Sequence, residues 1–178
     1  LFLFTADNGY LLGDHRMPGI GGKKWPHAVD VPLYAWWPRM LGRERRVVRE
    51  PVSNVDVAVT VCALAGCTLP DADGLDLGPL LSGETGRLGR DYLYTELLHA
   101  WEAMPPWYGL VTTRAYDPQA VWQYVEYADG ERELYDLRGD PFRLRNVVDA
   151  ARHAQRVAEF HERLHREVIE PRGVRFRG

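Results

Sequence analysis

The sequence predicts an α/β protein that begins with a buried strand and ends with a small antiparallel sheet and one packed helix. Three patterns indicate this arrangement. Residues 1–4 form a run of large apolar residues that stops at Asp7-Asn8-Gly9, as expected for a strand of a parallel sheet covered on both faces. Beyond residue 90, apolar and polar residues alternate with period two. Residues 150–169 carry an apolar stripe at helical spacing.

A long loop is predicted after the first strand. Residues 10–28 contain too many glycines and prolines for a long helix, and a loop of this length in a compact domain is usually functional. Its charged residues follow Asp7 and Asn8 closely in the chain; they include Asp14, His15, Arg16, Lys23, Lys24 and His27. The next strand is predicted over residues 31–38, which end at a proline.

A helix is predicted over residues 55–65, capped by Ser53 or Asn54 and ended by Gly66. Cys62 and Cys67 are the only cysteines of the chain. If both lay on this helix, about 7.5 Å of rise would separate them, which is beyond the reach of a disulfide. The spacing therefore predicts two free, buried thiols.

The second half of the chain predicts a four-stranded antiparallel sheet. Strands are expected over residues 92–97, 108–113, 121–127 and 133–137, and Asp129-Gly130 is a strong hairpin turn between the last two. The stripe of the final helix comprises Val157, Phe160, Leu164 and Val168. We expect two domains, an α/β part over residues 1–88 and the sheet with its helix over residues 89–178.

Composition excludes several classes of protein. The chain has 178 residues and a net charge of −3, and no basic block indicates binding to nucleic acid. No apolar run approaches the roughly 20 residues of a membrane span. Because the chain begins with Leu1 inside a strand-like run, we expect that it is truncated at its N-terminus. Nothing in the sequence indicates a compartment.

Asp7 and Asn8 are candidate metal ligands. A carboxylate and an amide oxygen side by side suit a hard cation such as Ca²⁺ or Mg²⁺. The turn that leaves the carboxyl end of a strand is also where open α/β sheets bind ligands. The alternative is an ordinary Asx turn with no ligand.

Five segments of the chain match one family in the right order. Residues 5–15 read T-A-D-N-G-Y-L-L-G-D-H, Gly22-Lys23 is followed by V-P-L at residues 31–33, and residues 51–56 and 65–66 read P-V-S-N-V-D and A-G. Residues 74–83 read G-L-D-L-G-P-L-L-S-G, and residues 133–146 contain E-L-Y-D-L, D-P and a final Asn. Together they resemble the sulfatases, in particular bacterial arylsulfatases and N-acetylglucosamine-6-sulfatase-like enzymes.

This resemblance implies a fold and a chemistry. The fold would be a fragment of an alkaline-phosphatase-like sandwich. The divalent cation of the family, most often Ca²⁺ with Mg²⁺ as the alternative, would be bound here by Asp7 and Asn8, and Lys23 would contact the sulfate oxygens. The substrate would be a small-molecule or sugar sulfate ester. The family's nucleophile is a formylglycine made from a C/S-x-P/A-x-R motif.

The chain departs from the family pattern in two respects. No C/S-x-P/A-x-R motif occurs in it, so we assign no catalytic residue and expect the nucleophile in the missing N-terminal half of the same enzyme. The segment between Lys23 and the next strand is shorter than in the family and lacks its arginine. For His15 a role in ordering the loop is favoured over proton transfer, and the role of His27 stays open. The aromatics Trp101, Trp107, Tyr108 and Trp122 are predicted to pack in the sheet rather than to bind sugar.

The sequence therefore predicts a fragment of a sulfuric ester hydrolase that is inactive alone. Two alternatives remain open. One is a phosphodiesterase or phosphonate hydrolase of the same superfamily, and the other is a non-catalytic, truncated module.

Overall fold

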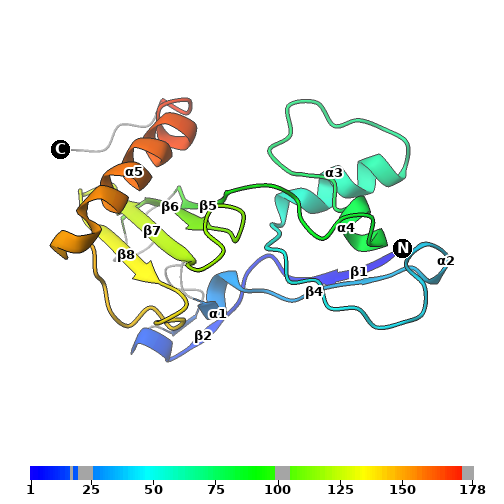
Figure 1. The fold of residues 1–178 in the computed structure, drawn as a ribbon, viewed down its shortest axis with the longest axis horizontal. Coiled ribbons are helices and arrows are strands. Elements are labelled where there is room, and N and C mark those ends of the chain that lie inside the picture. The colour runs from blue at the N-terminus through cyan, green and yellow to red at the C-terminus, as the bar shows by residue number, and fades with distance from the viewer. Residues whose placement is uncertain (17, 20–25, 99–104, 174–178) are drawn as a thin grey trace. The chain divides into compact units, whose positions relative to one another are not determined.

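The computed structural model describes residues 1–16, 18–19, 26–98 and 105–173. The chain divides into two compact units (Figure 1). Unit 1 comprises Leu1–Asp7 and Val31–Arg90, and unit 2 comprises Asn8–Asp30 and Asp91–Gly178. The expected domain boundaries, 1–88 and 89–178, stay a prediction. Among the described residues, no helix is long and apolar enough to cross a membrane.

Unit 1 contains a two-stranded ribbon and three helices. Strands β1 (Phe2–Thr5) and β4 (Leu33–Trp36) pair antiparallel, and the helices are α2 (Pro38–Leu41), α3 (Val55–Leu64) and α4 (Gly78–Ser82). The ribbon was expected to be buried on both faces in a parallel sheet, and in this chain that prediction is wrong. Phe2 is 60% exposed, and its cross-strand partner Trp36 is 65% exposed. An apolar run shows that a strand needs cover, but it does not identify the segment that provides it.

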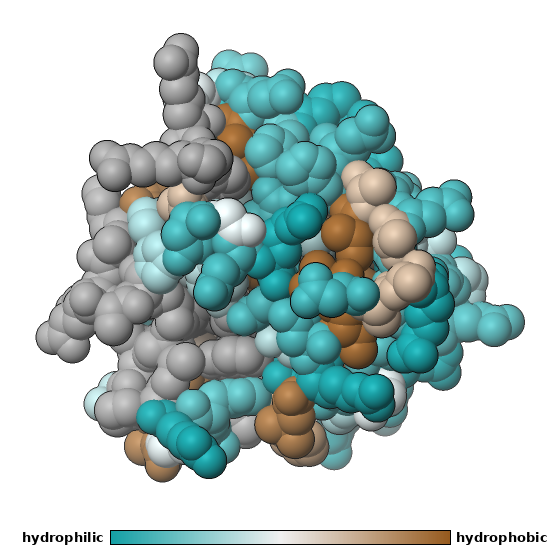
Figure 2. Space-filling view, turned by 90° about the vertical axis from the view of Figure 1, so that its left-hand side faces the viewer, coloured by the Kyte–Doolittle hydropathy of each residue, from teal (hydrophilic) through white to brown (hydrophobic). Residues whose placement is uncertain are grey.

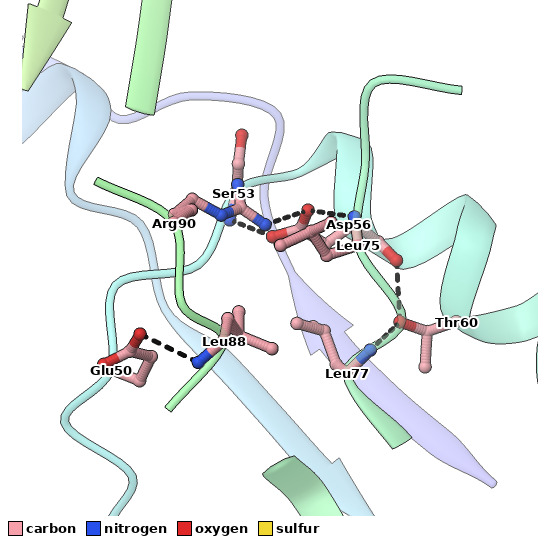
Figure 3. A network of polar contacts seen from close by, with 8 residues as sticks. All are labelled: Glu50, Ser53, Asp56, Thr60, Leu75, Leu77, Leu88 and Arg90. Carbon is pink, nitrogen blue, oxygen red and sulfur yellow. Dashed lines mark hydrogen bonds and ion pairs between the residues drawn. The ribbon is translucent and has the colours of Figure 1, made fainter. Parts of the chain in front are cut away.

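The predicted helix over residues 55–65 is confirmed as α3, but its buried face is polar. Asp56 and Thr60 are the buried residues of this helix. The Asp56 carboxylate accepts hydrogen bonds from the backbone N–H groups of Ser53 (2.7 Å) and Leu75 (2.8 Å). It also accepts one from the guanidinium of Arg90 at 2.6 Å (Figure 3).

Thr60 extends this network along the helix. Its hydroxyl donates to the Asp56 carbonyl at 2.7 Å and accepts from the backbone N–H of Leu77 at 2.8 Å. Asp56 and Thr60 therefore fasten residues 75–77 to α3 through main-chain donors. The segment lies very close to the helix, because a Cβ on Gly74 would come within 2.2 Å of the Val55 carbonyl oxygen.

Cys62 and Cys67 form a disulfide, so the prediction of free thiols is wrong. The helix ends at Leu64, and Gly66 takes a left-handed conformation with φ of 77°. The N–H of Cys67 donates to the Cys62 carbonyl and that of Gly66 to the Ala63 carbonyl, which is the Schellman arrangement. This turn brings the chain back over the last helical turn, so the two Cα atoms are 5.0 Å apart.

Unit 2 is built on the predicted antiparallel sheet, in the order β5–β6–β7–β8. Its strands are β5 (Tyr92–Leu97), β6 (Trp107–Thr112), β7 (Trp122–Tyr127) and β8 (Arg132–Asp136). The hairpin at Asp129-Gly130 is confirmed, with Gly130 at φ of 93° and its N–H on the Tyr127 carbonyl. Trp107, Tyr108 and Trp122 are buried in this sheet, as predicted. Trp101 lies outside the described residues.

One face of the sheet packs against the C-terminal helix (Figure 1). This helix comprises a 3₁₀ turn (Ala151–His153), α5 (Ala154–Leu164) and a π turn (His165–Ile169). Its predicted apolar stripe is confirmed, since Val157, Phe160, Leu164 and Val168 are all buried. They pack on residues of one sheet face that include Tyr124, Leu110 and Leu134. In Figure 2, the coloured residues on the face turned to the viewer are mainly hydrophilic, with hydrophobic patches between them.

The loop over residues 8–30 covers part of the opposite face. It contains β2 (Leu11–Leu12) and β3 (Pro18–Gly19), which pair antiparallel, a 3₁₀ turn (Asp14–Arg16) and α1 (Pro26–Val29). Leu11 and Ala28 are buried against Tyr135 of β8. Tyr135 is paired with Gln123, so it lies on the face that α5 does not cover.

We predict that the substitution Asp56→Ala strongly destabilises unit 1. It leaves Arg90 in a mostly buried position without its carboxylate and removes the acceptor of two backbone N–H groups. Breaking a buried ion pair costs about 3–5 kcal/mol, which chemical denaturation followed by circular dichroism would detect. Asp73→Ala, at an exposed acid of the same region, is the matched control and should change stability by less than about 0.5 kcal/mol. Equal effects of the two substitutions would contradict the structural role of Asp56.

We also predict a modest stabilisation by the disulfide. It closes a loop with a sequence separation of 5, and the loop-entropy relation gives about 2 kcal/mol for a loop this short. Denaturation with and without a reductant measures this difference. The double variant Cys62→Ser/Cys67→Ser is the control, because its stability should not respond to the reductant. An unchanged stability of the reduced wild-type chain would contradict the prediction.

Candidate functional site

The candidate metal ligand Asp7 lies just after β1, and its backbone is held by α3. Asn54 stands at the N-cap of α3, but its side chain makes no capping hydrogen bond. Instead its amide nitrogen donates to the carbonyls of Ala6 at 3.1 Å and Asp7 at 3.3 Å. Asn54 thus ties the start of the helix to the turn, while the Asp7 side chain is exposed.

The candidate ligand Asn8 begins unit 2, where two hydrogen bonds order its turn. Its side-chain nitrogen donates to the Gly9 carbonyl at 2.9 Å, and the Gly9 N–H donates to the Ala28 carbonyl at 3.1 Å. Ala28 is itself buried under the sheet of this unit. The two ends of the loop over residues 8–30 are therefore joined beside Asn8.

The end of the loop also meets a buried arginine. Arg143 is 4% exposed and has φ of 56°, and its Nε donates to the side chain of Gln123 on β7. Burial lowers the pKa of Arg143, and the negative charge of Asp30 opposes this change. The guanidinium of Arg143 thus binds Gln123, on the sheet face that α5 does not cover, close to Asp30 at the end of the loop.

The remaining candidates of the loop are placed only in part. Lys23 and Lys24 lie outside the described residues, and so does the side chain of His27. His15 is half-buried within the 3₁₀ turn and adopts a left-handed φ of 52°. The sulfate contact of Lys23 and metal binding by Asp7 and Asn8 stay predictions.

A shallow pocket in unit 1 is lined by Arg46, Arg49, Leu80 and neighbouring residues. The guanidinium of Arg46 donates to the Leu80 carbonyl at 2.6 Å and also to the Leu81 carbonyl. These carbonyls lie in the short helix α4, so Arg46 serves to hold it. We assign no ligand to this pocket.

Sequence reasoning missed a cluster in unit 2. Among the described residues, one group of His, Cys, Asp or Glu side chains brings three or more ligand atoms together, namely Glu126, His161 and His165. The signal that could have revealed it is the segment His161-Glu162-Arg163-Leu164-His165, an H-E-x-x-H pattern on a helix.

The fold is that of solved hydrolase structures. The crystal structure of a phosphonate monoester hydrolase of Agrobacterium radiobacter matches with a TM-score of 0.72 and 30% identity, over 91% of this chain and 33% of the hydrolase chain. The predicted fold class, an α/β fragment of an alkaline-phosphatase-like sandwich with a small antiparallel sheet and a packed helix, is confirmed.

The chain belongs to the family described as N-sulphoglucosamine sulphohydrolase, C-terminal, whose model matches residues 23–170. The predicted resemblance to the sulfatases is thereby confirmed. Steryl-sulfatase of Mus musculus is 37% identical over 138 residues, which are 69% of this chain and 20% of that protein. Delta 4,5-hexuronate-2-O-sulfatase of Bacteroides thetaiotaomicron is 26% identical over 165 residues, 89% of this chain and 32% of the relative. The chain thus spans between a fifth and a third of the length of these relatives.

Proposed function

We propose that this chain provides one edge of the active site of an enzyme that hydrolyses sulfate monoesters. The observation that carries the proposal is the T-A-D-N-G segment at the end of β1, in a chain whose residues 23–170 match the C-terminal sulfatase family. Two hydrogen-bonded anchors support it, since Asn54 holds the backbone before Asp7 and Gly9 is bonded to Ala28 just after Asn8.

Sulfatases use a metal ion, and we assign Asp7 and Asn8 as two of its ligands. The carboxylate and the amide oxygen fit a hard cation, which we take to be Ca²⁺, with Mg²⁺ as the alternative. When bound, such a cation acts as a Lewis acid on a sulfate oxygen. Two side-chain oxygens are few for an ion that takes six to eight, so the remaining ligands must come from elsewhere in the complete site.

Lys23 is assigned to the substrate. Its ammonium group would contact the sulfate oxygens and stabilise the negative charge that builds up on them during ester cleavage. No C/S-x-P/A-x-R motif is present in the 178 residues. A formylglycine nucleophile would therefore be supplied by the N-terminal half of the same enzyme.

The exposed ribbon of unit 1 is the surface that we assign to contact with the N-terminal part of the complete enzyme. Large apolar side chains are exposed along both of its strands; they are Phe2, Phe4, Tyr34 and Trp36. Contiguous apolar surface of this kind marks a contact with another segment of protein.

The substrate class is a small-molecule or sugar sulfate ester. One relative is named for a steryl sulfate and another for a hexuronate 2-O-sulfate, although both align with most of this chain. What the two names share is the sulfate ester, and this shared group is the part of the substrate that we assign to this chain.

A phosphonate monoester hydrolase is the second candidate, favoured by the 30% identity to the Agrobacterium structure. A third possibility is a folded module without catalysis. The coding sequence upstream of Leu1 discriminates among the three. An in-frame C-x-P-S-R motif supports the sulfatase, a threonine or serine nucleophile supports a phosphonate hydrolase or phosphodiesterase, and a stop codon supports the module.

We predict weak binding of Ca²⁺ by the isolated chain. In an NMR titration, the signals of Asp7 and Asn8 should shift with a dissociation constant of about 1 mM or weaker, because only two side-chain oxygens are present. Asp7→Asn should abolish these shifts. The matched control is Asp14→Asn, at an exposed acid of the following loop, which should leave them unchanged.

Two results would contradict the assignment of this cation site. Submicromolar affinity would show a complete site within the chain, and unperturbed Asp7 and Asn8 signals at saturating Ca²⁺ would show that these residues are not ligands.

We also predict that the purified 178-residue chain does not hydrolyse aryl sulfates, because it lacks an activated nucleophile. A fluorogenic aryl sulfate with Ca²⁺ present provides the assay, and the Asp7→Ala variant provides the background rate. Turnover by the wild-type chain above that background would overturn the proposed division of the active site.

A further inference from the structure

We propose that Glu126, His161 and His165 bind a transition-metal ion, with Zn²⁺ as the preferred occupant. This inference is independent of the proposed sulfatase function. It rests on a cluster that lies wholly in unit 2, between β7 and the C-terminal helix, and it concerns a different kind of metal from the one expected at Asp7 and Asn8.

The three side chains converge from two elements. Glu126 is on β7 and is 4% exposed, and its ladder partner on β6 is Tyr108, which belongs to the core under α5. His161 and His165 are four residues apart on the helix, so they lie on the same side of it. One ligand atom from each of the three residues lies within 4.8 Å of the other two.

Each histidine faces a different oxygen of the carboxylate. His161 Nδ1 is 2.5 Å from Glu126 Oε1, and His165 Nε2 is 2.8 Å from Glu126 Oε2. The two imidazole rings are 4.2 Å apart between centroids. In a tetrahedral zinc site, neighbouring ligand atoms are about 3.3 Å apart, so each of these two N···O distances would have to lengthen by less than about 1 Å to admit the ion.

Charge favours a cation at this point. Two imidazolium rings at 4.2 Å would repel each other, and one carboxylate balances only one of them. A divalent metal places its charge next to the carboxylate and accepts a lone pair from each neutral ring. Imidazole and carboxylate ligands suit Zn²⁺ and related ions, whereas Ca²⁺ requires oxygen ligands.

A hydrogen bond from a neighbouring tyrosine orients the Glu126 carboxylate. The hydroxyl of Tyr124 donates to Glu126 Oε1. This bond fixes the orientation of the Glu126 carboxylate, as the hydrogen-bond partners of metal ligands do, and Tyr124 itself is not assigned as a ligand.

The helix is irregular at this site. The N–H of Glu170 donates to the His165 carbonyl, an i→i+5 bond that widens the helix into the π turn His165–Ile169. Such turns occur frequently at functional sites. His161 is 45% exposed, so a water molecule can reach the fourth coordination position.

The pattern H-E-x-x-H is known from zinc-binding helices in which the glutamate acts as a base. Here Glu162 is exposed, and the third ligand comes from a strand. We therefore propose metal binding and no hydrolytic step. Arg132 is the ladder partner of Glu126 on β8, and its positive charge opposes the binding of a cation.

The test is a Zn²⁺ titration of the 178-residue chain in competition with a chromophoric chelator, followed by Co²⁺ absorption. The wild-type chain should bind one equivalent of Zn²⁺, and Co²⁺ should give the intense visible bands of a tetrahedral site. Zn²⁺ should also raise the melting temperature of the chain. His161→Ala/His165→Ala should abolish all three signals.

Further variants separate ligation from folding. Glu126→Gln keeps the shape of the buried side chain, and circular dichroism verifies its fold, yet it should lower the affinity more than Tyr124→Phe, for which about 10-fold is expected. Arg132→Gln should tighten binding. His153→Ala, at a histidine near the start of the same helix, is the matched control and should leave the affinity unchanged.

Three results would overturn the proposal. The first is equal affinity of the wild-type chain and the double histidine variant. The second is a loss of affinity in His153→Ala as large as in that variant. The third is the absence of tetrahedral Co²⁺ bands from a folded wild-type chain at saturating metal. None of these outcomes bears on the sulfatase assignment, which concerns other residues.

Discussion

The buried carboxylate of Asp56 is the interaction on which unit 1 depends. A fully buried charge is stabilising only if it is paired and hydrogen-bonded, and here the guanidinium of Arg90 and two main-chain N–H groups meet that condition. These partners come from segments far apart in the sequence, so one side chain joins the start of α3 to two later stretches (Figure 3).

Gly74 allows the close approach of its segment to α3, because any Cβ there would collide with the Val55 carbonyl. The same helix start carries Asn54, which holds the carbonyls of Ala6 and Asp7. The position of Asp7, the candidate metal ligand, thus depends on hydrogen bonds among residues that are not themselves candidate ligands.

Much of unit 2 could be predicted from the sequence, because its elements are specified by local patterns. Alternation of apolar residues gives strands, an Asp-Gly pair gives the hairpin, and the spacing of Val157, Phe160, Leu164 and Val168 gives the helix and its buried side. Unit 1 could be predicted less well, because its decisive contacts are polar. The buried residues of α3 are Asp56 and Thr60, which an analysis of apolar periodicity cannot identify. The disulfide was missed for a related reason. The spacing argument considered only the case in which both cysteines lie on the helix, whereas Gly66 reverses the chain in a Schellman turn and brings Cys67 back to Cys62.

The two candidate metal sites differ in how far their residues can be identified from the sequence. Asp7 and Asn8 are adjacent, and a short motif after an apolar strand is enough to single them out. Glu126 precedes His161 by 35 residues and His165 by 39 residues. Only the packing of β7 against the helix brings the carboxylate to the two histidines. The H-E-x-x-H spacing marks the histidines, but it does not point to Glu126, because the third ligand can come from any element that faces the helix.

The two proposed sites would also bind different kinds of metal. At Asp7 and Asn8 the proposed donors are oxygens, and a hard ion bound there would exchange readily with solvent until further oxygens complete its shell. At Glu126 the donors are two imidazole nitrogens and a buried carboxylate already oriented by Tyr124, a set that favours Zn²⁺ over Ca²⁺ by ligand type. Zn²⁺ bound in unit 2 would join β7 to the C-terminal helix and stabilise the sheet-and-helix unit, because a ligand that binds only the folded state favours folding. The hard cation, in contrast, would act on the sulfate. A chelator selective for Zn²⁺ would therefore affect stability, whereas one selective for Ca²⁺ would affect chemistry in the complete enzyme.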